Sequence, residues 1–163
     1  AAERLGYWMK TKRDFDFRCL RFPMVISPFA PPGAVTAYPG HACLAAKSGM
    51  PFTFPLKAET GMSTLYLMDV VHSLAEFTLC DKACVKQPAY NLHAYHFTAA
   101  MLAQNLQNRF PDATFTFEPK EPADSLITNW PNLIHDAHAQ NDWDWKNRYG
   151  FDDTIEAILE TIN

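Results

Sequence analysis

Short apolar runs typical of β-strands alternate along this chain with longer segments that have the spacing of amphipathic helices. The strand-type runs occupy residues 16–27, 51–56, 88–97 and 112–119. The helical segments occupy residues 1–13, 41–49, 98–111 and 152–163. Residues 63–80 read as a strand that continues into a helix. Because strands that alternate with helices usually pair in parallel through crossover connections, this pattern predicts an α/β fold.

The expected sheet is too small to be complete. Only two strands, at residues 17–22 and 89–94, look central, and the others are shorter. A doubly wound sheet usually has more strands, and an unpaired strand leaves its backbone N–H and C=O groups open. We therefore interpret residues 1–163 as a single partial domain, and we expect another polypeptide to complete its sheet.

Local signals mark the ends of several helices. The residues expected to cap or end them are Gly49, Thr98, Pro111 and either Asp152 or Asp153. Proline is concentrated at residues 23–39 and 111–131. These two stretches are predicted to be ordered connections rather than helices.

Charge and hydropathy exclude two classes of partner. The net charge is −4, and the sequence has no stripe of Lys and Arg of the kind that a nucleic-acid-binding protein needs. No apolar run reaches the roughly 18 residues that span a bilayer. The first ten residues lack the apolar core of a signal peptide. We expect neither a nucleic-acid partner nor a transmembrane segment.

Cysteine and histidine residues could indicate a metal site, but their sequence context does not favour one. His93 with His96, and His135 with His138, have the i, i+3 spacing that places two ligands on one helical face. No C-x-x-C motif accompanies them, and residues 91–97 look like the end of a strand. The four cysteines are too sparse for a disulfide scaffold and are expected to be reduced: Cys19, Cys43, Cys80 and Cys84. The sequence predicts no metal site.

A family resemblance emerges from an ordered set of motifs. They are "RCLRFPMVIS", "MSTLYLMDVV", "YNL", "FTFEP" and the long C-terminal stretch "ITNWPNLIHDAHAQNDWDWKNRYGFDDTIEAIL". In this order, with Trp130, Trp143 and Trp145 in register, they resemble the C-terminal half of the L-threonine 3-dehydrogenases, which are extended short-chain dehydrogenase/reductases. The resemblance implies the last strands of a Rossmann-type sheet together with the small substrate-side domain, incomplete by themselves.

The same resemblance implies that the reacting groups lie elsewhere. The family oxidises L-threonine with NAD, which binds at a glycine-rich turn in the N-terminal half. Its proton acceptor is the Tyr of a Y-x-x-x-K motif, whose pKa the Lys cation lowers. This sequence has no G-x-G pair and no Tyr followed four residues later by Lys. If Glu3 matches the Glu that follows the family's Lys, the dyad would precede Ala1. We therefore expect no catalytic residue and no bound cofactor in this chain alone, with NAD implied for the parent family.

Four residues are carried over as candidate binding residues. The resemblance places Pro23 and Met24 at the nicotinamide end of the pocket, where Met24 replaces a Gly and would crowd the ring. It also implies that Thr36 and Trp130 contact the substrate. Trp130 could equally be a core aromatic in a proline-rich turn. Asp69 is expected to cap a helix rather than to take part in chemistry.

Of the other matched positions, Asp142, Trp143 and Trp145 are expected to pack the last helix down. They are therefore interpreted as architectural residues, outside the pocket.

Two classes of function remain. The first is the substrate-side half of a threonine-dehydrogenase-like enzyme, inactive until an N-terminal half joins it. The second is a non-catalytic structural or accessory subunit of a larger assembly, derived from such an enzyme. Thr36 and Trp130, which the resemblance retains, are compatible with the enzyme half. Met24 in place of Gly favours the structural subunit. A mitochondrial location is expected, by analogy with remnant subunits of mitochondrial complexes, with the cytoplasm as the alternative.

Overall fold

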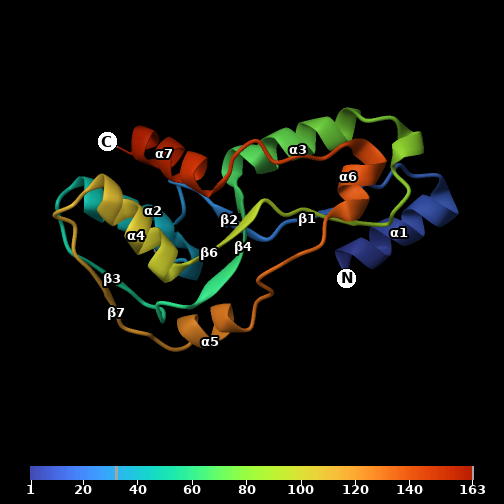
Figure 1. Ribbon diagram of the computed structural model, residues 1–163. Coiled ribbons are helices and arrows are strands. Elements are labelled where there is room, and N and C mark those ends of the chain that lie inside the picture. The colour runs from blue at the N-terminus through green and yellow to red at the C-terminus, as the bar shows by residue number, and fades with distance from the viewer. Residues whose placement is uncertain (32, 163) are drawn as a thin grey trace.

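The computed structural model describes residues 1–31 and 33–162 as an elongated molecule with its two termini far apart (Figure 1). The first half contains α1 (Ala2–Arg13), β1 (Leu20–Arg21), β2 (Met24–Ile26), η1 (Val35–Ala37), α2 (Tyr38–Lys47), β3 (Phe52–Phe54), β4 (Gly61–Tyr66) and α3 (Leu67–Leu79). The second contains η2 (Lys82–Cys84), β5 (Tyr90–Asn91), β6 (Tyr95–Thr98), α4 (Ala99–Arg109), β7 (Phe115–Phe117), α5 (Ala123–Thr128), α6 (Ala137–Trp143) and α7 (Phe151–Thr161). The α/β prediction is confirmed. No helix within these residues is long and apolar enough to cross a membrane.

The strands form three small sheets rather than one. β1 pairs with β5, β2 and β6 flank β4, and β3 pairs with β7. Three of these pairs are parallel, as predicted, but β4 and β6 run antiparallel. Alternation of side chains does not encode strand direction. The chain passes from β4 through α3, η2 and β5 to β6, so a helix between two strands does not by itself make the pair parallel.

The two strands predicted to be central are each divided. The strand expected at 16–27 becomes β1 and β2, which belong to different sheets, and the strand expected at 88–97 becomes β5 and β6. Pro23 supplies the physical reason for the first break, because proline has no N–H to donate to a ladder. The segments 17–22 and 89–94 are not the centre of a larger sheet among the described residues, since β1 and β5 pair only with each other there.

The helix ends agree with most local signals. Thr98 caps α4 by accepting a hydrogen bond from the N–H of Met101 at 3.2 Å, and α4 ends before Pro111. α2 ends before Gly49, whose φ of +65° suits a residue without Cβ. The last helix is capped differently from the prediction. Gly150 is its N-cap, and Asp153 lies in the first turn, where its carboxylate accepts the N–H of Gly150 at 2.9 Å.

The proline-rich stretches contain more helix than predicted. η1 and the start of α2 fall within residues 23–39, and α5 falls within residues 111–131. In both cases a proline stands at the helix start, Pro39 in the first turn of α2 and Pro122 at the N-cap of α5. Proline is tolerated there because the first N–H groups of a helix have no intrahelical partner. α6 was not predicted either, because its sequence has little apolar periodicity.

The core consists of two clusters of buried side chains on opposite faces of β4. Cluster 1 includes Met62 and Tyr66 of β4 and packs them against α2, β3, α4 and α7. Cluster 2 includes Leu65 of β4 and packs it against Phe77 of α3, against β5 and against Trp145. Because side chains alternate along a strand, β4 serves both clusters at once.

Trp143 and Trp145 therefore do not pack the last helix down, and this prediction is wrong. Both lie in cluster 2, whereas the buried residues of α7 belong to cluster 1. Asp142 fixes α6 to β5 instead, because it accepts hydrogen bonds from the Tyr90 hydroxyl at 2.9 Å and the Lys86 ammonium at 3.1 Å. The Tyr90 hydrogen bond, with the ion pair to Lys86, lowers the pKa of this carboxyl.

Asp69 also has another role than the predicted helix cap. α3 has no side-chain cap, and Asp69 lies fully buried in its first turn. Its carboxylate accepts the backbone N–H groups of Arg148 at 2.9 Å and Tyr149 at 3.2 Å. Burial raises the pKa of this carboxyl in spite of the two hydrogen bonds. Asp69 thus holds the segment that leads into α7 against α3.

Gly61 permits the close approach of β4 and β6. A Cβ at this position would lie 2.7 Å from the carbonyl oxygen of Phe97 and 2.6 Å from Nε2 of His96. A backbone oxygen cannot rotate away, so Gly61→Ala is expected to lower the free energy of unfolding by about 1–3 kcal/mol in urea titrations. Gly40→Ala in α2 is the matched control. Its Cβ would approach no atom closer than 3.4 Å, so no loss is expected. Equal stability of the two variants would contradict this account.

Candidate functional site

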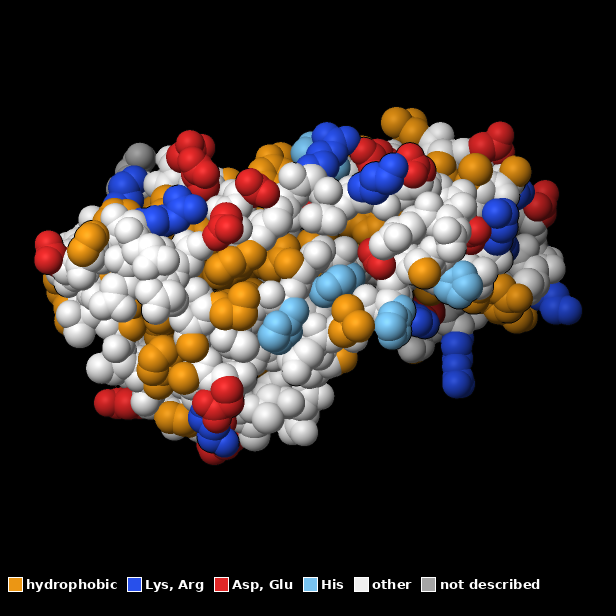
Figure 2. All heavy atoms as spheres, viewed as in Figure 1, with side chains coloured by type: hydrophobic (Ala, Val, Ile, Leu, Met, Phe, Trp, Pro, Cys, Tyr) orange, Lys and Arg blue, Asp and Glu red, His pale blue; other side chains and the backbone are white. Residues whose placement is uncertain are grey.

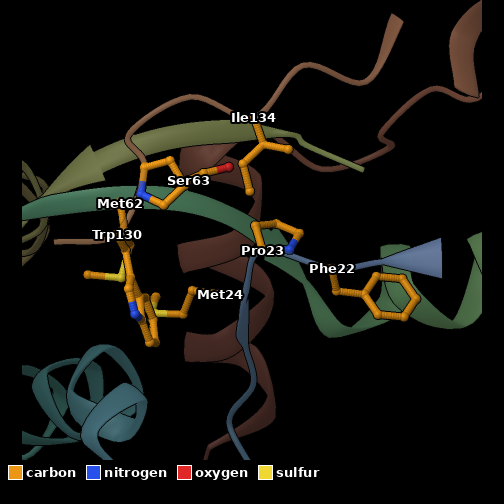
Figure 3. A pocket seen from close by; sticks show the side chains of 8 residues that line it. Phe22, Pro23, Met24, Met62, Ser63, Trp130 and Ile134 are labelled. Carbon is orange, nitrogen blue, oxygen red and sulfur yellow. The ribbon is translucent and has the colours of Figure 1, made fainter. Parts of the chain in front are cut away.

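A cavity of about 230 Å³ lies where the chain changes from one sheet to another. Phe22, Pro23 and Met24 supply one wall, at the junction of β1 and β2. Met62 and Ser63 of β4 supply the second wall. The segment after α5 supplies the third wall, with Trp130, Pro131 and Ile134. Figure 3 shows the side chains of Met24 and Met62 beside the indole of Trp130.

Ser63 is one of the residues that line this cavity. It is only 2% exposed, and its Oγ lies 2.6 Å from Nδ1 of His93, which follows β5. Burial lowers the pKa of His93, with the neighbouring His96 and His135 acting in the same direction and Asp136 opposing them. The imidazole is therefore neutral near pH 7, and the tautomer decides which of the two groups donates.

A second, polar cavity of about 200 Å³ is lined by His93 together with Asp136, Gln140, Trp145 and Lys146. Asp136 is already engaged, because it accepts the indole N–H of Trp145 at 3.1 Å and the Gln140 amide at 2.8 Å. Figure 2 shows histidine side chains gathered along the narrowed middle of the molecule. Within the described part of the chain, no group of three or more His, Cys, Asp or Glu residues could hold a metal ion.

The structure brings together three of the four candidate binding residues. Pro23, Met24 and Trp130 line the cavity, whereas Thr36 lies in η1 and is not among the lining residues. Sequence reasoning did not identify Ser63, and it considered His93 only with His96 as a metal pair, which it did not favour. The alternation of "GMSTLY" could have placed Ser63 on the opposite face from Met62, but nothing local to the sequence pairs it with a histidine 30 residues away.

The chain is similar in sequence to L-threonine dehydrogenases and to epimerase/dehydratases. It is 27% identical to the mitochondrial L-threonine 3-dehydrogenase of Bos taurus over 97% of its own length and 43% of that protein. It is 26% identical to an uncharacterised epimerase/dehydratase of Staphylococcus epidermidis, again over about half of that protein, 51%. No protein-family model matches the chain.

Solved structures give the same relationship. The GalE-like L-threonine dehydrogenase of Cupriavidus necator superposes with a TM-score of 0.92 at 27% identity, over 99% of this chain and 58% of that one. The L-threonine dehydrogenase of Phytophthora infestans superposes with a TM-score of 0.89 at 28% identity, over 97% and 52%. This chain thus spans about half the length of the proteins that it matches. It is a partial homologue of the L-threonine 3-dehydrogenases and of the epimerase/dehydratases among the short-chain dehydrogenase/reductases.

Proposed function

We propose that this chain is the substrate-side, C-terminal half of an L-threonine-dehydrogenase-like oxidoreductase and has no such activity by itself. The observation that carries the proposal is the match of nearly the whole chain, with a TM-score of 0.92, to only 58% of a threonine dehydrogenase. The cavity at Pro23, Met24 and Trp130 supports it, since these are the positions that resemblance assigned to the pocket. The sequence contains no Y-x-x-x-K motif that could accept the hydroxyl proton.

The chain's own residues do not fit a whole NAD molecule. The described residues that line the cavity offer one hydroxyl group and no cation for a pyrophosphate. The sequence has no G-x-G turn that could bring phosphate to a helix N-terminus. Met24, only 5% exposed, fills part of the space beside Trp130. NAD binding is therefore assigned to a companion polypeptide.

A companion polypeptide also accounts for uncovered parts of the structure. β1 has β5 on one side and no strand on its other side among the described residues. Parallel strands are normally buried between neighbours. Large apolar side chains are exposed close by in sequence, with Leu5 at 59%, Trp8 at 49% and Phe15 at 50%. Large apolar side chains exposed on one segment are typical of an interaction surface. We propose that the companion pairs with β1 and covers α1.

The reaction tests the proposal directly. NADH formation from L-threonine and NAD is measured with the chain alone and after co-expression with a polypeptide that carries the glycine-rich turn and the Y-x-x-x-K motif. We expect no turnover by the chain alone and measurable turnover by the pair. The control is the companion expressed without this chain, which should be inactive because it lacks the substrate-side wall. Turnover by the chain alone, or no turnover by a stable complex, would contradict the proposal.

Met24 supports a second candidate function. A methionine in place of the family's glycine narrows the nicotinamide end of the cavity, as expected of a structural subunit that no longer binds cofactor. Two relatives, from Bos taurus and Sus scrofa, are named as mitochondrial proteins, so we propose a mitochondrial assembly as the host of such a subunit. Affinity purification of the native protein separates the two candidates. A partner with the two missing motifs supports the enzyme, and partners unrelated to dehydrogenases support the structural subunit.

A further inference from the structure

The polar cavity beside His93 has no role in the proposed function. Its volume of about 200 Å³ lies below the roughly 300–1,000 Å³ that is usual for pockets of drug-sized ligands, so it suits a small group. His93 and Ala94 form one wall, and side chains between Asp136 and Asn147, on and after α6, form the rest. The hydrogen bonds that these side chains already make determine which donors and acceptors remain for a ligand.

Ser63 fixes the tautomer of His93. Ser63 is 2% exposed, and Nδ1 of His93, at 2.6 Å, is the hydrogen-bond partner that the described residues give its Oγ. A buried hydroxyl that donates to nothing costs free energy, so the Ser63 O–H donates to Nδ1. A neutral imidazole whose Nδ1 accepts carries its proton on Nε2. His93 therefore has a fixed N–H donor at Nε2.

This donor faces the polar cavity. The two nitrogens of an imidazole ring point away from one another, and Nδ1 of His93 is directed at Ser63 of β4. His93 lines the polar cavity and does not line the apolar one. Its Nε2 makes no hydrogen bond to the described residues, and it is not among their buried side-chain atoms that lack a partner. It is therefore open to a ligand.

Two side-chain amides supply acceptors. Gln140 donates from Nε2 to Asp136 at 2.8 Å, and Asn147 donates from Nδ2 to the backbone oxygen of Tyr149 at 2.9 Å. Their oxygens, Oε1 of Gln140 and Oδ1 of Asn147, have no hydrogen-bond partner among the described residues. Since both exposed side chains line the cavity, these oxygens are available to a ligand that donates.

The formal charges of the lining are already compensated. Each carboxylate oxygen of Asp136 accepts one N–H, and the ammonium of Lys146 lies 2.9 Å from the carboxylate of Asp144. Burial lowers the pKa of His93, and Asp136 lies close enough to oppose this effect. A ligand anion at Nε2 of His93 would be repelled by Asp136, and a ligand cation would meet the N–H donor. An uncharged polar group avoids both costs.

We infer that the polar cavity binds a primary carboxamide group, whose oxygen accepts the Nε2–H of His93 and whose NH₂ group donates to the amide oxygens of Gln140 and Asn147. The donor and the two acceptors of the wall match the oxygen and the two N–H donors of this group. This inference goes beyond the proposed function, because it concerns a different cavity and requires neither the companion polypeptide nor NAD.

Three probes of nearly the same shape test the preference for an uncharged amide: acetamide, acetate and acetamidinium. Each is titrated into the 163-residue chain near pH 7 and followed by NMR. We expect saturable shifts at His93, Gln140 and Asn147 with millimolar acetamide, a range set by the few atoms of the probe. Acetate and acetamidinium should bind at least about fivefold more weakly. Binding of either ion as tight as that of acetamide would overturn the inference.

The nitrogen NMR shifts of the His93 ring report its tautomer directly. In the free chain near pH 7 we expect a protonated Nε2 and an unprotonated Nδ1, because Nδ1 accepts from Ser63. A ring protonated on Nδ1 alone would present no donor to the cavity and would overturn the inference.

Two variants test the contacts separately. His93→Phe keeps a ring and removes the donor, and Asn147→Ala removes one acceptor. Each is expected to weaken acetamide binding about fivefold, the loss of one hydrogen bond. Asn141→Ala, at an exposed position of α6 outside the cavity lining, is the matched control and should bind as the unchanged chain does. Far-UV circular dichroism verifies folding, and if His93→Phe unfolds, the two asparagine variants decide. Equal acetamide affinity of these two would overturn the inference.

The two proposals fail separately. Acetamide binding by a chain whose complex with the companion is inactive leaves this inference standing and removes the proposed enzyme. An active complex whose isolated 163-residue chain binds no acetamide does the reverse.

Discussion

Phe54→Ala is expected to lower the free energy of unfolding by about 3–5 kcal/mol, the usual cost of removing a fully buried phenylalanine ring. Phe54 is 0% exposed in cluster 1. Its ring lies 5.0 Å from that of Phe52, 5.2 Å from that of Phe117 and 6.0 Å from that of Tyr38, measured between centroids. It therefore joins the β3–β7 sheet to α2, and an alanine would leave a cavity between the layers.

Urea titration followed by circular dichroism measures this loss, and Phe52→Ala is the matched control. Phe52, two positions before Phe54 on β3, is only half-buried, so its truncation should cost about 1–2 kcal/mol. Small domains are stable by only about 5–15 kcal/mol, so the Phe54 variant is expected to be largely unfolded at moderate urea concentrations. A loss below that of the Phe52 variant would show that β3 is not fixed to the core through Phe54.

Trp145→Ala is expected to have an effect of similar size in cluster 2, again about 3–5 kcal/mol. Trp145 is 2% exposed, and its ring centroid lies 5.7 Å from that of Trp143. Its indole N–H donates to Asp136 at 3.1 Å. The substitution would thus remove packing under α6 and also leave the Asp136 carboxylate with one partner fewer.

Trp145→Phe separates the two contributions, because it keeps an aromatic ring and loses the N–H. We expect it to cost about 1–2 kcal/mol, near the value of one hydrogen bond with slight loss of packing. Near-UV and far-UV circular dichroism of Trp145→Ala are compared for coincident urea transitions. Since β4 belongs to both clusters, we expect the transitions to coincide. Loss of the near-UV signal well before the far-UV signal would show that cluster 2 unfolds independently.

Much of the fold could be predicted because its signals are local. Thr98 caps the helix that follows it, and Gly49 adopts a positive φ directly after α2. Phe115 and Phe117 alternate with Thr116 as in any half-buried strand. In each case the residue acts on its own neighbours along the chain. Pairing is different: nothing within "YHFT" reveals that β6 would run antiparallel to β4.

The candidate site was predictable only in part, for the same reason. Pro23, Met24 and Trp130 were identified through resemblance to a family, and the structure places them around one cavity. The Ser63–His93 contact joins β4 to the segment after β5, and it forms only because these two parts of the chain lie side by side. Residues of this kind gain their role from tertiary structure, so a single sequence does not reveal them.

The change of sheet at Pro23 gives the cavity a mechanical connection to the edge of the molecule. Only Phe22 and Pro23 separate β1 from β2, and both of them line the cavity. The proline ring fixes φ of Pro23, which restricts the conformations of this short link. Because the two linking residues also belong to the cavity wall, a protein that displaced β1 would move part of that wall with it.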